Sequence, residues 1–160
     1  MYLKASKYVS GWEHSGLNDL KQFKSVLRAA GIPVSCVTDE APSLEVTFNV
    51  AYWRKANAIH SWFVRECQKG VDECQTLSCV SREQLAELRD LCAEAIKLKE
   101  AGCKPEVASA KLLPQSGFFF GSTEVGEWYW QDLARTVKNL TAILNAPALK
   151  DCEFYYHSSW

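Results

Sequence analysis

The sequence predicts an α+β fold: a single globular domain over residues 1–160, with about four helices packed on a small, largely antiparallel sheet. Helical and strand-like periodicities are interspersed along the chain, and no Gly/Ser-rich or charged linker divides it. The strand-like segments are short. One of them, residues 44–50, alternates apolar and polar side chains, as does a strand with one face in water. Strands of a parallel sheet, buried on both faces, are instead continuous apolar runs.

The N-terminal part is expected to contain a strand, a helix and a short β-prone stretch. Residues 1–9 alternate loosely, as in a strand. From Leu17 onward, apolar residues recur at helical spacing. Gly31 permits the left-handed backbone conformation that ends a helix, and Pro33 prevents the helix from continuing. The β-prone residues 33–37 follow.

The middle of the chain is expected to hold a strand followed by a helix. A turn at residues 39–42 precedes the alternating strand. The second helix should run over residues 51–69 and end at Gly70, where a glycine permits the left-handed conformation. Residues 71–80 then indicate a loop with a short strand.

The third helix has a clear start signal. Ser81 and Gln84 have the spacing of a capping box, in which the two residues satisfy each other's free backbone N–H groups. The helix should reach about residue 99 and end at Gly102, and residues 106–113 could add one further turn.

The C-terminal part should contain one more helix between two strands. Residues 118–120, three phenylalanines between two glycines, are too apolar for a free loop and predict a short buried strand. A fourth helix is expected over residues 127–144, and residues 153–156 predict a final strand.

Composition excludes several classes of protein. The formal net charge of −1 argues against a nucleic-acid partner, since a nucleic-acid binder normally has a basic face. No apolar run approaches the roughly 20 residues that span a bilayer, so no membrane partner is expected. Residues 1–10 lack the apolar region of a secretory signal. We therefore expect a cytoplasmic protein with reduced thiols.

The seven cysteines do not predict a metal site. No CxxC pair occurs, and the nearest approximation, Cys67, Cys74 and Cys79, has spacings wider than zinc sites usually show. Free cysteines commonly behave as small buried apolar residues. We expect neither a metal nor a cofactor.

Aromatic residues are concentrated in three segments. Residues 52–63, 118–130 and 154–160 hold 14 of the 19 aromatic side chains. On the second expected helix, Tyr52 and Trp53 fall in the apolar arc, with His60 near its centre and Asn57 at its edge. A polar group in such an arc needs a partner, because leaving it unpaired costs about 1–3 kcal/mol. His60 is therefore either a neutral histidine of the core, bonded to a carbonyl, or part of a pocket with Asn57.

The fourth expected helix has the opposite anomaly. Its apolar face holds Tyr129 and Trp130, whereas Trp128 projects to the polar side with Asp132 and Arg135. A large aromatic on a polar stripe is either covered by another segment or used at a surface. Asp132 and Arg135, three residues apart, are either an exposed ion pair or part of a binding site.

Three sequence blocks resemble a known family. They are YWRKANAIHSWF (Tyr52–Phe63), LLPQSGFFFGSTE (Leu112–Glu124) with EWYW (Glu127–Trp130), and YYHSSW (Tyr155–Trp160). In order and spacing these blocks, about a fifth of the chain, resemble a family of short proteins of tailed phages. Where the family pattern has Tyr-Asp, this chain has Val125-Gly126, which argues against an acid there as metal ligand or catalyst. The resemblance implies no particular fold or catalytic residue, but a phage accessory protein acting in the host bacterial cytoplasm.

These observations favour a non-enzymatic binding module that sequesters a small anionic, nucleotide-like ligand, with counter-defence as one role. Aromatic faces flanked by Arg54, Lys55 and Arg135 suit a base and its phosphates. The residues expected to bind the ligand are Trp53, Arg54, Asn57, His60, Ser116, Trp128, Asp132, Arg135, Tyr156, His157 and Trp160.

Two other functions stay open from the sequence. The chain could inhibit a host protein, with Trp128 and Trp160 as surface anchors, because buried tryptophans dominate interface energetics. It could also be a small hydrolase or transferase, with Ser116 or Cys67 as nucleophile and His60, His157 or Glu124 as its base, although no catalytic motif supports this. A homo-oligomer is compatible with any of these functions.

Overall fold

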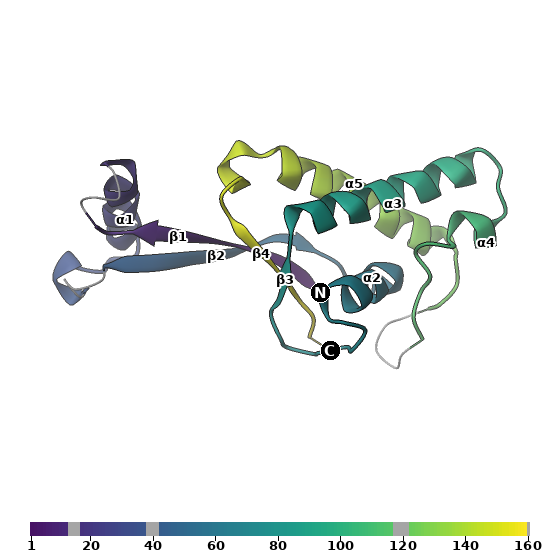
Figure 1. Cartoon of the computed structure of the whole chain (residues 1–160), viewed down its shortest axis with the longest axis horizontal. Coiled ribbons are helices and arrows are strands. Elements are labelled where there is room, and N and C mark those ends of the chain that lie inside the picture. The colour runs from purple at the N-terminus through teal and green to yellow at the C-terminus, as the bar shows by residue number, and fades with distance from the viewer. Residues whose placement is uncertain (13–16, 38–41, 117–121, 160) are drawn as a thin grey trace. The chain divides into compact units, whose positions relative to one another are not determined.

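The fold is α+β, as the sequence predicts (Figure 1). The structure is a computed structural model that describes residues 1–12, 17–37, 42–116 and 122–159. Its main elements are β1 (Tyr2–Ser10), α1 (Leu17–Ala29), β2 (Ser43–Tyr52), α2 (Asn57–Cys67), β3 (Ser78–Val80), α3 (Arg82–Glu100), α4 (Pro105–Ala108), α5 (Glu127–Asn145) and β4 (Glu153–His157). The antiparallel sheet has the strand order β2-β1-β4-β3, and Cys79 of β3 lies opposite Tyr155 of β4.

The chain divides into two compact units. One comprises Met1–Ala5 and Asn49–Trp160, and the other comprises Ser6–Phe48. Strands β1 and β2 each contribute residues to both units. The single globular domain expected over residues 1–160 stays a prediction. The candidate site described below lies within the first unit.

The Ser6–Phe48 unit has a small core of its own. Val9 of β1 packs with Phe23 and Leu27 of α1, on the apolar face that the helical spacing predicts. The helix ends as expected, because Gly31 adopts φ +69° and the N–H of Ile32 bonds to the carbonyl of Leu27.

The β-prone stretch at residues 33–37 is not a strand. It forms a 3₁₀ helix over Val34–Cys36, in which the N–H of Cys36 bonds to the carbonyl of Pro33 and that of Val37 to Val34. In so short a segment, local hydrogen bonds of this kind satisfy the backbone without a partner strand. Residues 39–41 of the turn expected at 39–42, and all of the strand expected at 118–120, lie outside the described ranges.

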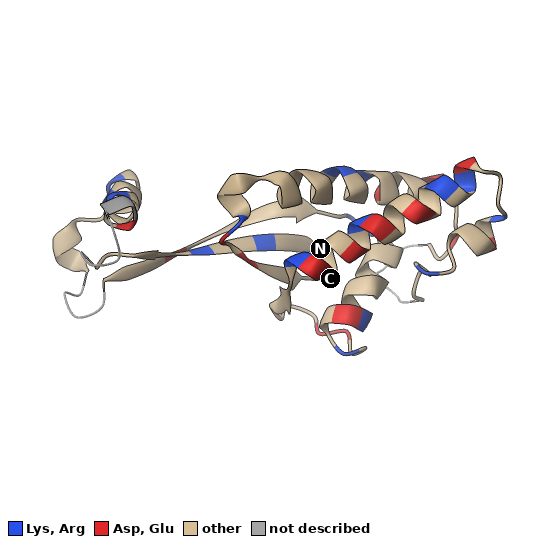
Figure 2. Ribbon diagram, turned by 45° about the horizontal axis from the view of Figure 1, so that its top comes forward, with Lys and Arg blue, Asp and Glu red and all other residues tan. Residues whose placement is uncertain are grey.

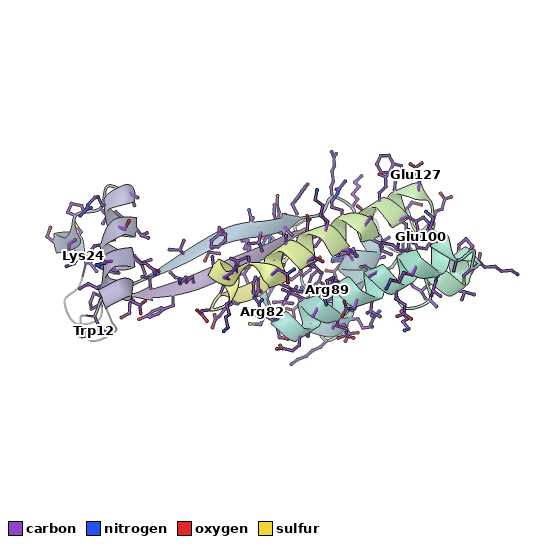
Figure 3. All side chains as sticks on the ribbon, turned by 90° about the horizontal axis from the view of Figure 1, so that it is seen from above. Trp12, Lys24, Arg82, Arg89, Glu100 and Glu127 are labelled. Atoms are coloured by element: carbon purple, nitrogen blue, oxygen red, sulfur yellow. The ribbon has the colours of Figure 1, made fainter. Side chains whose placement is uncertain are left out.

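Helices α3 and α5 lie side by side and antiparallel in the first unit (Figure 1). Figure 3 shows Arg82 at the start of α3 and Glu127 at the start of α5, at opposite ends of this helix pair. The guanidinium of Arg82 donates to the carbonyls of Leu144, at 2.7 Å, and Leu149, at 3.1 Å. A cation at the C-terminal end of α5 also complements the helix dipole. At the other end, the Lys99 Nζ lies 5.0 Å from the ring centre of Trp130.

Helix α3 begins with the predicted capping box. The Ser81 hydroxyl accepts from the N–H of Gln84 at 3.1 Å, and the Gln84 side chain accepts from the N–H of Ser81 at 2.9 Å. Leu85, Leu88 and Cys92 of its apolar face are buried. Figure 2 shows acidic and basic residues interspersed along α3, as the polar side of an amphipathic helix requires.

The second helix starts later than predicted. Strand β2 continues to Tyr52, and α2 begins only at Asn57, so Tyr52 and Trp53 are not helical. The N–H of Trp53 donates to the carbonyl of Met1, and the Met1 amino group donates to that of Trp53. These bonds to a segment 52 residues away hold the backbone extended. Tyr52 is consequently 49% exposed rather than part of the core.

Candidate functional site

A cleft of about 390 Å³ lies between the start of α2 and the first turns of α5. Polar and charged side chains from three segments line it, together with small apolar residues. Its described lining residues include Arg54, Lys55, Ala56, Asn57, Pro114, Ser122, Glu124, Trp128, Asp132 and Arg135. Five of the residues predicted to bind a ligand therefore meet here: Arg54, Asn57, Trp128, Asp132 and Arg135.

One side of the cleft is positively charged, and the backbone of one residue there, Lys55, is strained. Arg54 and Lys55 are exposed and directly precede α2. Lys55 has φ +57°, a left-handed conformation that costs a residue with a Cβ roughly 1–2 kcal/mol. The first N–H groups of a helix have no intrahelical partners, and Ala56 at the N-cap offers no side-chain acceptor to those of α2. This side of the cleft, the cationic end, therefore combines two cations with the positive end of a helix dipole.

The other side of the cleft is a stripe along α5, formed by Trp128, Asp132 and Arg135. Positions four and seven residues apart lie on one face of a helix. Trp128 is 78% exposed, as its place on the polar side predicts. Asp132 is half-buried; burial raises the pKa of its carboxyl group, while the Arg135 guanidinium acts in the opposite direction. We call these three residues the α5 stripe.

A buried hydrogen-bond chain connects the two sides. The indole N–H of Trp53, the residue before Arg54, donates to the Thr136 hydroxyl at 2.9 Å. That hydroxyl donates to the backbone carbonyl of Asp132 at 2.7 Å. Trp53 is 0% exposed and belongs to the core, so it is not among the residues that line the cleft, although it was predicted to bind the ligand. Its position instead ties the cationic end to the turn of α5 that carries Asp132.

Asn57 holds a third part of the wall in place. Its side-chain oxygen accepts from the N–H of Gln115 at 2.8 Å, and its amide donates to the carbonyl of Ser122 at 3.4 Å. Its side chain is 5% exposed, which explains why a polar residue occurs at the edge of an apolar arc. Asn57 thus positions two segments that are distant from it in the sequence.

His60 belongs to a buried network rather than to the cleft. Its Nε2 lies 3.1 Å from Oδ2 of Asp72, and its Nδ1 lies 2.6 Å from the Tyr156 hydroxyl. An ionised carboxylate only accepts, so Nε2 carries the proton and the Tyr156 hydroxyl donates to Nδ1. Burial is the main influence on the pKa of His60 and lowers it, while Asp72 acts to raise it. His60 is therefore a satisfied core histidine, with a carboxylate rather than a carbonyl as partner.

Of the remaining residues predicted to bind a ligand, those in the described part of the chain are not among the residues that line the cleft. Tyr156 is fully buried, and its ring stacks on Phe63 with centroids 4.1 Å apart. The ring of His157 lies 6.3 Å from that of Tyr2. Ser116 is exposed beside the segment that is not described, and Trp160 lies outside the described residues.

The geometry gives little support to nucleophilic catalysis. Burial raises the pKa of the Cys67 thiol to about 12, whereas a catalytic cysteine needs a thiolate near neutral pH. His60, its proposed base, already has two partners. Within the described ranges, no three His, Cys, Asp or Glu side chains converge to hold a metal ion.

Four lining residues were not among those predicted to bind the ligand: Lys55, Ala56, Ser122 and Glu124, although Lys55 was expected to flank the aromatic faces and Glu124 was considered as a catalytic base. The adjacent pair Arg54-Lys55 was a usable signal, because two cations before a helix are available to an anion at its N-terminus. The other three residues carry no signal in their type or spacing. They reach the cleft only because α2 and α5 pack together.

Comparison with known proteins adds no further constraint. No protein-family model matches the chain, and no curated protein or solved structure is significantly similar to it. None of the helices in the described part of the chain is long and apolar enough to cross a membrane.

Proposed function

We propose that this protein is a non-enzymatic binding module whose cleft takes a small anionic, nucleotide-like ligand. The observation that carries the proposal is the division of the cleft into a cationic end and a stripe with an exposed tryptophan. A nucleotide has the same division, into charged phosphates and a flat aromatic base.

The cationic end suits the phosphates. Arg54 and Lys55 offer charged donors, and the first backbone N–H groups of α2 add uncharged ones. The N-terminus of a helix favours anions because of its dipole, and the first turn of α2 contains no acidic residue that would compete.

The α5 stripe suits the base. Trp128 exposes most of its indole, and stacking of a base on an aromatic side chain contributes about 1–3 kcal/mol. The cleft of about 390 Å³ falls in the size range of small-molecule sites, roughly 300–1,000 Å³.

Isothermal titration calorimetry with mononucleotides, cyclic nucleotides and ADP-ribose tests the proposal. We expect Trp128→Ala to weaken binding about 5- to 150-fold, the equivalent of the stacking free energy. Trp12→Ala is the matched control, because Trp12 is a partly exposed tryptophan outside the cleft. Failure of every compound to bind at millimolar concentration would refute the proposal, as would equal losses in the two variants.

The cationic end has its own test. We expect Arg54→Ala and Lys55→Gly to behave differently, although both remove a positive charge. Arg54→Ala should weaken binding, and should make it less sensitive to salt. Lys55→Gly removes the same charge but relieves the strain of φ +57°, so it should weaken binding while raising the free energy of unfolding.

Inhibition of a host protein is the second candidate function. The observation that favours it is the 78% exposure of Trp128, since tryptophan is the residue type most enriched at interface hot spots. In this case Trp128→Ala would abolish a stoichiometric complex with a host protein, while Arg54→Ala would change its affinity little. A nucleotide-binding module instead predicts that Trp128→Ala and Arg54→Ala both weaken binding of the nucleotide when no partner protein is present.

The biological setting rests on the resemblance to tailed-phage proteins. We propose that the protein acts in the bacterial cytoplasm and sequesters a nucleotide-like signal of the host, which would make it a counter-defence factor. Sequestration predicts recovery of the ligand unchanged after denaturation of the complex. Recovery of a converted product would instead indicate an enzyme.

A further inference from the structure

The Asp132 carboxylate is an unusual feature of a cleft that binds anions. It is half-buried in the α5 stripe, between Trp128 and Arg135. Its backbone carbonyl accepts from Thr136, but no described side chain or N–H group hydrogen-bonds to its carboxylate oxygens. Arg135 influences its pKa electrostatically, and no ion pair among the described residues joins the two side chains. The cleft therefore presents an acceptor whose hydrogen bonds are left for a ligand.

The position of Asp132 fits the base rather than the phosphates. It follows Trp128 by one turn of α5, so the two side chains are neighbours on one helix face. A base stacked on the indole would have one edge directed along the helix toward the carboxylate. Phosphates would be attracted to the cationic end and repelled by this carboxylate.

We propose that Asp132 selects guanine among the bases, an inference that rests on the proposed function of the cleft. An ionised carboxylate has two oxygens that only accept hydrogen bonds. Guanine presents two adjacent donors on its Watson–Crick edge, the N1–H and the N2 amino group, so one carboxylate can accept both. Adenine presents an amino donor beside the N1 acceptor, and that nitrogen would face a carboxylate oxygen with no proton between them.

This selectivity should be appreciable because both hydrogen bonds involve a charged acceptor. Bidentate recognition of a base edge discriminates by about 1–3 kcal/mol, which is about 5- to 150-fold in affinity. The partial burial of Asp132 adds to this effect, since an acceptor shielded from water loses more when its partner is missing.

The substitution Asp132→Asn provides a specific test, because it changes the hydrogen-bonding groups of this side chain while preserving the side chain's shape. Asparagine replaces one accepting oxygen with a donating amino group. Xanthine has an N1–H donor next to the C2 carbonyl, the pattern that asparagine complements. We therefore expect this variant to prefer xanthine to guanine.

The experiment measures the affinities of guanosine, adenosine and xanthosine monophosphates for the wild-type protein and for Asp132→Asn by calorimetry. We expect the wild type to bind the guanine nucleotide about tenfold or more tightly than the adenine one, and the variant to prefer the xanthine nucleotide. Asp90→Asn on α3 is the control, since Asp90 is exposed and outside the cleft, and it should retain the wild-type order.

The possible failures are distinguishable. Equal affinities of the wild type for guanine and adenine nucleotides would overturn the guanine assignment alone, as would an unchanged order in Asp132→Asn. Absence of binding by all three compounds to a folded wild type would refute the proposed function, and the guanine assignment with it. Thermal melting of each variant confirms that the fold is retained.

Discussion

The indole N–H of Trp53 donates to the hydroxyl of Thr136, 2.9 Å away in the core. The same hydroxyl donates to the backbone carbonyl of Asp132. Because Trp53 directly precedes Arg54, one buried threonine joins the cationic end of the cleft to the α5 stripe. The core and the candidate site are therefore coupled at a single side chain, and changes there should affect both stability and binding.

Thr136→Val is the first prediction. Valine has nearly the same shape but no hydroxyl, so the buried indole N–H of Trp53 is left without its acceptor. We expect the free energy of unfolding to fall by about 1–3 kcal/mol, measured by urea denaturation. Thr136→Ser keeps the hydroxyl, so its free energy of unfolding should fall distinctly less. A Thr136→Val variant as stable as the wild type would contradict the role of the hydrogen bond.

Asn57→Ala is the second prediction. The change leaves the N–H of Gln115 and the carbonyl of Ser122 without their side-chain partner. We expect a loss of about 1–3 kcal/mol in the free energy of unfolding and faster hydrogen exchange at the Gln115 amide. Gln131→Ala, which removes an exposed bond to Glu127, should change stability by less than about 0.5 kcal/mol. Unchanged exchange at Gln115 would contradict the assigned role of Asn57.

The pH dependence of stability is the third prediction. Burial lowers the pKa of His60 below its value in the unfolded chain, so the unfolded state binds the proton more tightly. The contribution of His60 is therefore present above the ordinary histidine pKa of about 6.5 and is lost as pH falls through the folded pKa. We expect the free energy of unfolding to decrease between about pH 7 and pH 5, and a smaller decrease in His60→Gln.

Asp72→Asn gives an independent check of the same network. Asp72 raises the pKa of His60 through its hydrogen bond and its charge, so this substitution should lower the pKa of His60 further. An NMR titration of the imidazole measures both values. A His60 pKa above that of an unstructured peptide in the wild-type protein would refute the buried, neutral assignment.

Cysteine reactivity is the fourth prediction. Burial raises the pKa of Cys67 and of Cys92 to about 12, so neither forms a thiolate near neutral pH, whereas Cys36 and Cys79 are exposed. We expect iodoacetamide to label Cys36 and Cys79 in the native protein, and to label Cys67 and Cys92 only after unfolding. Mass spectrometry of the peptides checks this. Labelling of native Cys67 as fast as Cys36 would reopen the hypothesis of a cysteine nucleophile.

Local sequence patterns were sufficient to predict those helix starts and ends that depend on only a few neighbouring residues. The capping box of Ser81 and Gln84 starts α3, and Gly31, Gly70 and Gly102 all adopt the positive φ that ends a helix. The polar placement of Trp128 was also predictable, because helical phasing depends only on spacing along α5.

The start of α2 and the roles of its polar residues needed long-range contacts. Residues 51–53 suit a helix by composition, but strand pairing through Tyr52 and the bonds of Trp53 to Met1 keep them out of one. Likewise, periodicity located His60 and Asn57 in or beside an apolar arc but could not supply Asp72, Tyr156 or Gln115 as their partners.

The sequence by itself thus determined the α+β class, the limits of α3 and α5, and the presence of an exposed tryptophan, because these depend on periodicity and on local capping. Only the tertiary structure decided which polar residues face the cleft. Arg54 and Asp132 are far apart along the chain, and both line the cleft because Trp53 bonds to the Thr136 hydroxyl, which in turn bonds to the carbonyl of Asp132. No local pattern encodes such contacts, since their free energy depends on the packing of the whole unit.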